Sequence, residues 1–365
     1  MTKDLHKTPF DEGTIVKLAL YENYIKEWLP VFLSFSSLKF RRINIFDFFS
    51  GPGMDTTGCK GSPLITIDLL HPYWPNIISN DLEVNLFFND KRKNKIYQLE
   101  KYISELKIES KPYSIKYSTE SFEGAFKKYL PIMEKDKTAN FLFLDQNGIK
   151  HVTDDIFKTL VDLPTTDFLF FTSSSTLHRF KEHPEIKKYI NIPINQNPVS
   201  TYLHIHRIVL DYYRGLIPKG KEYYLAPFSI KKGANIYGLI FGTGHMIGIY
   251  KFIKQCWKID PQTGDSNFDI DRDNIDPRQP SLFPEKDKPK KLQNFEFDLS
   301  NAILDRKLVT NKDIYKYTLF NGFLAEHARK IIIDLIIAGS LPKQRINISY
   351  DSCKVGKPNQ TIIYE

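Results

Sequence analysis

The sequence has few cysteines and lacks the spaced motifs of several enzyme classes. Its three cysteines, Cys59, Cys256 and Cys353, are about a hundred or more residues apart. This spacing suits neither a disulfide framework nor a zinc cluster. The chain has no HExxH sequence, no Walker Gly-Lys-Ser/Thr loop and no nucleophile elbow. These absences argue against zinc peptidases, P-loop NTPases and α/β-hydrolases.

Long hydrophobic runs are also missing. No uncharged apolar stretch approaches the roughly 20 residues that cross a bilayer, and the start MTKDLHKTPFDEG has no apolar signal core. We therefore expect a cytoplasmic protein that does not enter a membrane. Lys and Arg number 51 against 43 Asp and Glu, which gives a formal net charge of +8. Such an excess permits nucleic-acid binding without establishing it.

Short apolar runs alternate with helical patterns along the first 259 residues. Residues 12–36 carry apolar side chains at helical spacing, which predicts one or two helices. Strand-like runs lie at residues 42–49, 84–89, 114–117, 140–144, 167–171 and 237–241, with helical patterns at 91–106, 122–129 and about 246–257. This alternation predicts a Rossmann-like, doubly wound α/β sheet with helices on both faces.

The composition changes after this region. Residues 260–294 are rich in Asp, Pro and Lys and are predicted to be a linker or excursion. Helical patterns at 299–304, 312–317 and 323–337 precede strand-like residues at 345–349 and 361–364. Three helices followed by a β-hairpin are the order of a winged helix-turn-helix, so residues 295–365 are predicted to form one.

The predicted winged helix would present basic residues to nucleic acid. The candidates on its third helix are His327, Arg329 and Lys330, and those on its hairpin are Lys354 and Lys357. Winged helices also serve as protein–protein modules, and that alternative stays open.

The first strand ends in a Gly-x-Gly turn. Two glycines here would let the backbone approach a ligand closely. Position 56 is Thr, so the dinucleotide fingerprint is incomplete, and a plain turn is the alternative. Because doubly wound sheets bind ligands at the carboxyl ends of their strands, this turn is a candidate cofactor contact. The residues are Asp47, Phe49, Ser50, Gly51, Pro52 and Gly53.

The next two strands end near acidic residues. A nucleoside ligand needs a carboxylate that accepts hydrogen bonds from the ribose hydroxyls, and Asp90 ends the second strand. It could instead cap the following helix, and Asp81 and Glu83 are competing ribose ligands. Glu120, after the third strand, would meet an adenine edge or be an ordinary loop carboxylate.

The fourth strand delivers Asp145 and Gln146 to the same edge of the sheet. In enzymes that methylate exocyclic amines, an acid or amide at this place accepts a hydrogen bond from the amino group and orients it. A simple turn is the alternative. Beyond the fifth strand, Arg179 is placed either to meet a phosphate or to cap a helix.

Several of these segments together resemble the three-Cys-motif partner (TcmP) family. The resemblance rests on TIVKLALYENYIKEWLP, on FFSGPG followed by GSPL, on FLFLDQNG and on FGTGHMIGIYKFIKQCWKID. It implies an S-adenosylmethionine-dependent, methyltransferase-like sheet domain, a radical-SAM-like partner protein, and a bacterial or phage origin. One residue departs from the family pattern, because Gln146 stands where the family usually has Pro.

The leading hypothesis is therefore a methyltransferase-like protein that binds S-adenosylmethionine and acts on nucleic acid, in a defence or modification setting. Two alternatives stay open. One is a defence nuclease whose acidic strand ends bind Mg²⁺, and the other is a non-catalytic scaffold that binds partners through the winged helix.

Overall fold

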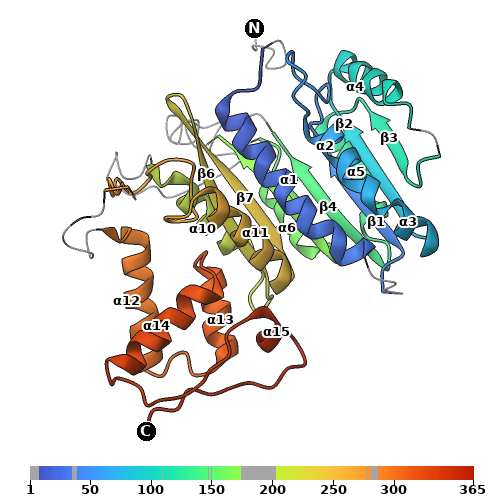
Figure 1. The fold of residues 1–365 in the computed structure, drawn as a ribbon. Helices are drawn as coiled ribbons and strands as arrows, with labels where there is room; N and C mark the ends of the chain where they lie inside the picture. Colours follow the sequence, from blue (N-terminus) through green and yellow to red (C-terminus); the bar gives the residue numbers. More distant parts are fainter. Residues whose placement is uncertain are drawn as a thin grey trace.

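One mixed sheet forms the centre of the protein (Figure 1). The computed structural model describes residues 8–34, 39–108, 110–146, 148, 150–173, 203–276, 278–279, 281 and 287–365. The strand order across the sheet is β3-β2-β1-β4-β5-β7-β6. The strands are β1 (Arg42–Asp47), β2 (Glu83–Asn89), β3 (Ser114–Ser118), β4 (Thr138–Leu144), β5 (Thr166–Thr172), β6 (Tyr224–Lys232) and β7 (Asn235–Thr243).

Strands β1 to β5 pair in parallel, and β7 runs antiparallel to both β5 and β6. All the strands predicted for this domain are confirmed, and β6 is an additional one. The sequence hides β6 because it contains Pro227, which argues against a strand in general. In the fold, β6 pairs along its length with β7 only, so an edge position accommodates a residue without an N–H group.

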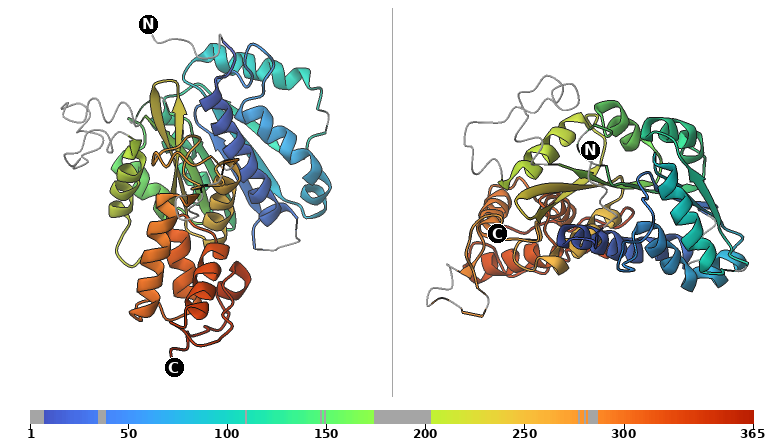
Figure 2. Two further views of the ribbon diagram at one scale, coloured as in Figure 1. Left: turned by 60° about the vertical axis from the view of Figure 1, so that its left-hand side comes forward. Right: turned by 90° about the horizontal axis from the view of Figure 1, so that it is seen from above.

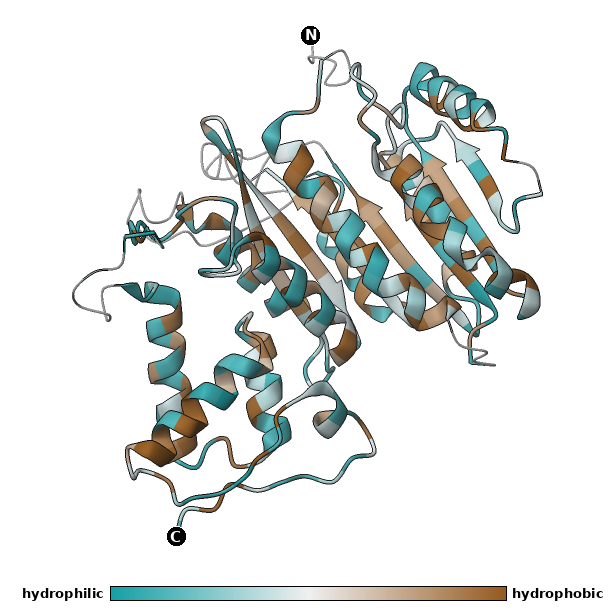
Figure 3. Cartoon of the chain, in the orientation of Figure 1, coloured by the Kyte–Doolittle hydropathy of each residue, from teal (hydrophilic) through white to brown (hydrophobic). Residues whose placement is uncertain are grey.

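Helices cover both faces of the sheet, as predicted (Figure 2). Those on one face include α1, α2 and α11, and those on the other include α5, α6 and α10. Hydrophobic residues are concentrated on the strands, whereas the helices carry both hydrophobic and hydrophilic residues (Figure 3). The helices of this domain are α1 (Glu12–Leu33), α2 (Ser62–Leu70), the 3₁₀ helix η2 (His71–Tyr73), α3 (Trp74–Ser79), α4 (Lys93–Glu105), α5 (Phe122–Met133), α6 (Asp154–Asp162), α10 (Ile205–Leu216) and α11 (Met246–Ile259).

The first helix, α1, lies across the sheet and forms one side of the site described below. It begins after Asp11, whose carboxylate accepts a hydrogen bond from the Thr14 N–H at 2.9 Å and so caps the helix. Tyr21, Tyr24 and Trp28 recur at helical spacing on its buried face. The structure therefore has one continuous helix here, where the sequence allowed one or two. Among the described residues, no helix has both the length and the apolar character of a membrane span.

Four further helices follow residue 287. They are α12 (Lys290–Leu304), α13 (Asn311–Phe320), α14 (Ala325–Ile337) and the short α15 (Tyr350–Cys353). They pack beside α11 and β6 at one edge of the sheet. Arg214 donates a hydrogen bond to the Phe320 carbonyl at 2.6 Å, and the Trp257 ring N–H donates one to the Gly322 carbonyl at 2.9 Å. The three predicted C-terminal helices are confirmed, the first of them longer than expected.

The predicted β-hairpin is wrong. Residues 345–349 and 361–364 form no strands, and the one bridge in this region joins Thr310 to Thr361. Side-chain amides take the backbone partners that a hairpin would use. The Gln344 amide accepts from the Ile363 N–H at 2.9 Å and donates to the Ile363 carbonyl at 2.8 Å. The Asn347 N–H donates to the Gln360 amide oxygen at 2.7 Å.

The acidic segment after α11 is not a free linker. Asp265 and Asp271 both bind Arg207 of α10, and α12 begins at Lys290, before the predicted boundary at 295. Ser266 forms a parallel bridge with Ser229 of β6. The aspartates that made this segment resemble a linker are therefore the residues that fasten it to the sheet domain.

Candidate functional site

A cavity of about 770 Å³ opens at the carboxyl ends of the central strands, beside the start of α1. Its volume lies within the roughly 300–1,000 Å³ of small-molecule sites. Among the predicted cofactor and substrate contacts, the cavity brings six together. These are Phe49, Ser50, Gly53, Asp90, Glu120 and Asp145.

The Gly-x-Gly turn has a backbone conformation and a packing that favour glycine. Gly53 has a φ of +81°, and a Cβ atom added there would lie 2.5 Å from the Leu99 methyl group of α4. The Gly61 N–H donates to the Gly53 carbonyl at 2.7 Å and closes the loop. Gly51 and Pro52 are buried and lie outside the cavity lining. Of the predicted Gly-Pro-Gly contacts, only Gly53 faces the cavity.

Asp90 lies at the end of β2 and is already held by a neighbouring cation. One carboxylate oxygen accepts from the Arg92 backbone N–H at 2.9 Å and from its Nε at 3.0 Å, and the other accepts from Nη2 at 2.9 Å. A carboxylate offers about four acceptor sites. Asp90 therefore keeps room for a ribose hydroxyl, and more if Arg92 moves away.

The competing ribose ligands lie at the wrong end of the sheet. Glu83 begins β2 and forms an ion pair at 2.8 Å with Arg42, which begins β1. Asp81 precedes Glu83 in the turn before β2. Glu120 does line the cavity, and its carboxylate pairs with Lys128 at 2.6 Å. Only Asp90 and Glu120 of these four acids are therefore placed to meet a ligand.

Asp145 is bound by a lysine that the sequence analysis did not select. Lys17 of α1 donates a hydrogen bond to the Asp145 carboxylate, and the side chain of Lys17 is 10% exposed. Lys17 lies four residues before Tyr21, on the buried face of α1. A lysine on an otherwise apolar helix face was the signal that could have identified it.

Asp47, at the end of β1, lies beneath this ion pair and is 1% exposed. It accepts hydrogen bonds from the Ser62 hydroxyl at 2.6 Å and from the Phe49 N–H at 3.1 Å. Burial raises the pKa of Asp47 to about 7, and the nearby Asp145 carboxylate adds to the rise while Lys17 opposes it. Asp47 therefore titrates near neutral pH without lining the cavity itself.

Gln146 does not join Asp145 at the cavity. It is 1% exposed, and its amide oxygen accepts from the His151 backbone N–H at 2.9 Å. Its place is beneath the loop after β4, where it holds that loop rather than a substrate. Arg179 lies outside the described residues.

Every carboxylate that lines the cavity has a cationic partner or a histidine. This pairing leaves no group of free acids, and no cluster of three or more His, Cys, Asp or Glu suited to a metal occurs in the described part of the chain. The Mg²⁺-nuclease alternative therefore has no ligand set among these residues. The pairs are Asp11–Lys232, Asp90–Arg92, Glu120–Lys128, Glu123–His151 and Asp145–Lys17.

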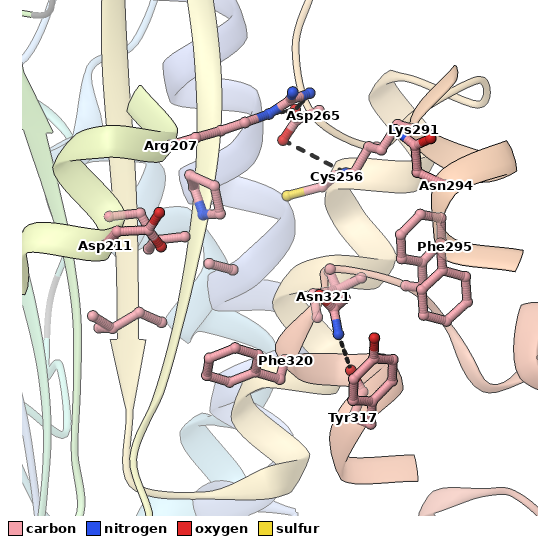
Figure 4. Close-up of a pocket in the computed structure, with 18 of the residues that line it drawn as sticks. Arg207, Asp211, Cys256, Asp265, Lys291, Asn294, Phe295, Tyr317, Phe320 and Asn321 are labelled. Carbon is pink, nitrogen blue, oxygen red and sulfur yellow. Dashed lines mark hydrogen bonds and ion pairs between the residues drawn. The ribbon is translucent and has the colours of Figure 1, made fainter. Parts of the chain in front are cut away.

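A second cavity, of about 290 Å³, separates the sheet domain from the C-terminal helices (Figure 4). Arg207 and Lys291 approach the buried Asp265 carboxylate at 2.6 and 3.6 Å. Burial raises the pKa of Asp265, but Lys291 and Arg207 together hold that pKa well below its usual range. Arg207 of α10, Asp265 and Lys291 of α12 thus form an ion cluster that links the sheet domain to the C-terminal helices.

The predicted nucleic-acid residues of the C-terminal helices have different surroundings. Arg329 and Lys357 line a shallow cavity of about 550 Å³, where Arg329 also donates to the Ile348 carbonyl at 2.9 Å. Lys330 is exposed, and Lys354 pairs with Asp351. His327 instead packs on Trp257 at 4.3 Å between ring centroids. None of these residues lines the cavity at the strand ends.

No family model and no curated protein matches the chain. Among solved structures, it is similar to Trm1 from Pyrococcus horikoshii in complex with S-adenosyl-L-methionine, at 11% identity over 95% of this chain and 90% of that one, with a TM-score of 0.39. It is also similar to the METTL16 methyltransferase domain, at 11% identity over 62% of this chain and 82% of that one, with a TM-score of 0.28. A third similar structure is geranyl diphosphate C-methyltransferase from Streptomyces coelicolor A3(2), at 12% identity over 66% of this chain and 82% of that one, with a TM-score of 0.27.

All three scores lie below 0.5, so the likenesses add nothing on the site, and the fold is assigned from this chain's own topology. The order β3-β2-β1-β4-β5 of the parallel strands is that of a doubly wound, Rossmann-like sheet, and β7 extends it as an antiparallel strand between β5 and β6. The predicted α/β fold class is confirmed.

Proposed function

We propose that the chain binds S-adenosylmethionine in the cavity at the strand ends and transfers its methyl group to a nucleic-acid acceptor. One observation carries this proposal. The cavity joins Gly53, Asp90 and Asp145 across the ends of three adjacent strands, the place where doubly wound sheets bind nucleoside ligands.

Each of these residues has a distinct role in the proposal. Gly53 leaves room for the methionine part, and Asp90 accepts hydrogen bonds from the ribose hydroxyls. Asp145 accepts one from the acceptor amine and so orients the nitrogen lone pair. S-adenosylmethionine would supply the methyl group from its sulfonium: the acceptor nitrogen would form the new C–N bond, sulfur would keep the electron pair of the broken C–S bond, and the amine would release one N–H proton to solvent.

The wider setting belongs to the same proposal. Membership of the TcmP family, a radical-SAM-like partner, a role in antiviral defence, DNA or RNA as acceptor and a cytoplasmic location are predictions from the sequence. The C-terminal helices, which contribute no described residue to the lining of the cavity at the strand ends, would bind nucleic acid or the partner.

Calorimetry with S-adenosylmethionine tests the proposed cofactor. At a ligand concentration 100 times Kd, binding should stabilise the protein by about 2.7 kcal/mol. We expect Asp90→Ala to weaken binding at least about tenfold, since a hydrogen bond to a charged group contributes about 1.5–3 kcal/mol. Arg92→Ala should keep or strengthen binding, because it frees Asp90 for the ribose.

Glu100→Ala, on the exposed face of α4, is the matched control and should bind as the wild type does. If S-adenosylmethionine raises the melting temperature of Asp90→Ala as much as that of the wild type, the assignment of Asp90 to the ribose is wrong. Methyl transfer is then measured with labelled cofactor on DNA and RNA pools. Metal-dependent cleavage of those pools without transfer would favour the nuclease instead.

A further inference from the structure

The proposed cofactor contacts Gly53 and Asp90 follow β1 and β2, whereas another part of the same cavity lies over β4, β5 and β7. Side chains alternate between the two faces of a strand, and Asp145, Phe171 and Tyr237 all fall on the face that α1 covers. The register supports this placement, because Phe143 pairs with Leu169 and Phe171 pairs with Leu239. Three adjacent strands thus carry a row of one carboxylate and two aromatic rings along the cavity.

The two rings form a platform that is open to the cavity. Phe171 and Tyr237 stack with their centroids 4.9 Å apart and their planes 23° apart. Both line the cavity and both are only partly buried, unlike most aromatic residues of this sheet. The Lys17 ammonium lies 5.1 Å from the Phe171 centroid. Phe171 is thus covered by Tyr237 and Lys17, whereas Tyr237 lines the cavity as an aromatic ring on which another planar ring can stack.

Lys17 and Asp145 stand side by side at the edge of this platform. The ammonium of Lys17 only donates hydrogen bonds, and the carboxylate of Asp145 only accepts them. Adenine, cytosine and guanine each present an exocyclic or ring N–H beside an acceptor nitrogen or oxygen. The ion pair therefore complements the edge of a nucleobase, with Asp145 facing the amine and Lys17 facing the neighbouring acceptor.

We infer that this part of the cavity holds an unpaired nucleobase, stacked on the Tyr237 ring that Phe171 supports and bound at its edge by Lys17 and Asp145. The inference rests on the proposed function and names its substrate class. A base inside a duplex cannot reach such a platform, so the substrate is single-stranded or has its target base flipped out. Lys17 is a specificity residue here, because it contacts the base edge and fixes the Asp145 carboxylate.

The test uses the full chain saturated with S-adenosylhomocysteine and fluorescently labelled ten-nucleotide single strands of DNA and of RNA. Each strand carries one adenine, cytosine or guanine at its centre among abasic sites, and a fully abasic strand has the same charge. We expect the strands with a base to bind at least about fivefold more tightly than the abasic strand. The DNA and RNA arms identify the sugar.

Four variants separate base recognition from general charge. Tyr237→Ala and Lys17→Met should each remove the preference for the strand with a base, and Tyr237→Phe should retain it because the ring remains. Tyr97→Ala is the control, since Tyr97 is a 69% exposed tyrosine on α4 away from the cavity. Calorimetry with S-adenosylmethionine on each variant shows whether the fold and the cofactor part of the cavity are intact.

The outcomes distinguish the two proposals. If the wild type binds S-adenosylmethionine but shows no difference between strands, or binds none of them, the nucleobase inference is overturned and the cofactor assignment stands. If S-adenosylmethionine itself does not bind, the proposed function fails, whatever the strands do. A preference for a base that survives in Tyr237→Ala would place the base elsewhere.

Discussion

An Asp265→Ala variant should lose about 3–5 kcal/mol of its free energy of unfolding, which is the usual effect of breaking a buried ion pair. The Asp265 side chain is 4% exposed and meets Arg207 at 2.6 Å and Lys291 at 3.6 Å. Without it, the Lys291 ammonium loses its carboxylate partner and Arg207 keeps only Asp271. Urea denaturation at pH 7 measures the loss.

Asp211→Ala is the matched control for this prediction. Asp211 lines the same cavity and pairs with Arg214 at 3.4 Å, but its side chain is 72% exposed, so its removal should change stability by less than about 1 kcal/mol. Because the pKa of Asp265 is held below its usual range, its contribution is present above pH ~4 and is lost as pH falls. Equal losses in both variants would show that the buried cluster does not join the two parts of the chain.

An Asp47→Asn variant should be more stable than the wild type at pH 8. A folded-state pKa of about 7 against a usual value of 3.8 means that ionising Asp47 opposes folding. Wild-type stability therefore falls as pH rises from about 4 to about 7, by at most about 4 kcal/mol at about 1.4 kcal/mol per pKa unit. Asn cannot ionise, and its amide oxygen can still accept from Ser62 or from the Phe49 N–H.

Thermal unfolding of both proteins at pH 4, 6 and 8 measures this effect, and the gain should grow with pH. Asp55→Asn, in the loop that follows β1, is a control because it should change stability in the opposite direction. Burial raises the pKa of Asp55, but hydrogen bonds from Phe10, Cys59 and Thr57 lower that pKa to about 2. That variant should be less stable than the wild type at pH 8. An Asp47→Asn gain that is independent of pH would contradict the assignment.

The sequence predicts the sheet well because buried parallel strands are continuous apolar runs. NFLFL in β4 and DFLFF in β5 are examples, and the polar residues at their ends fall at one edge of the sheet. This is why Asp90 and Asp145 could be placed near one cavity. Helix α2 escaped prediction because its nine residues, SPLITIDLL, mix polar and apolar side chains without a clear helical period.

What the sequence could not reveal are partners brought together by the fold. Lys17 and Asp145 are separated by 128 positions, and the stacking of Phe171 on Tyr237 depends on the reversed strand β7. The hairpin fails for a similar reason. Ile346 and Ile348 favour a strand by residue type, but Gln344 and Gln360 bind the backbone groups that strand pairing needs.

The bridge between Ser266 and β6 has a consequence for the protein in concentrated solution. The outermost strand of a sheet offers unpaired backbone groups to which other molecules can add, and this is a common route to aggregation. Here the Ser229 N–H donates to the Asp265 carbonyl at 2.7 Å, and the Asn267 N–H donates to the Ser229 carbonyl at 3.2 Å. The segment after α11 thereby shields β6. At the opposite edge of the sheet, β3 is only five residues long and carries Lys116. Both features disfavour the addition of a strand from another molecule.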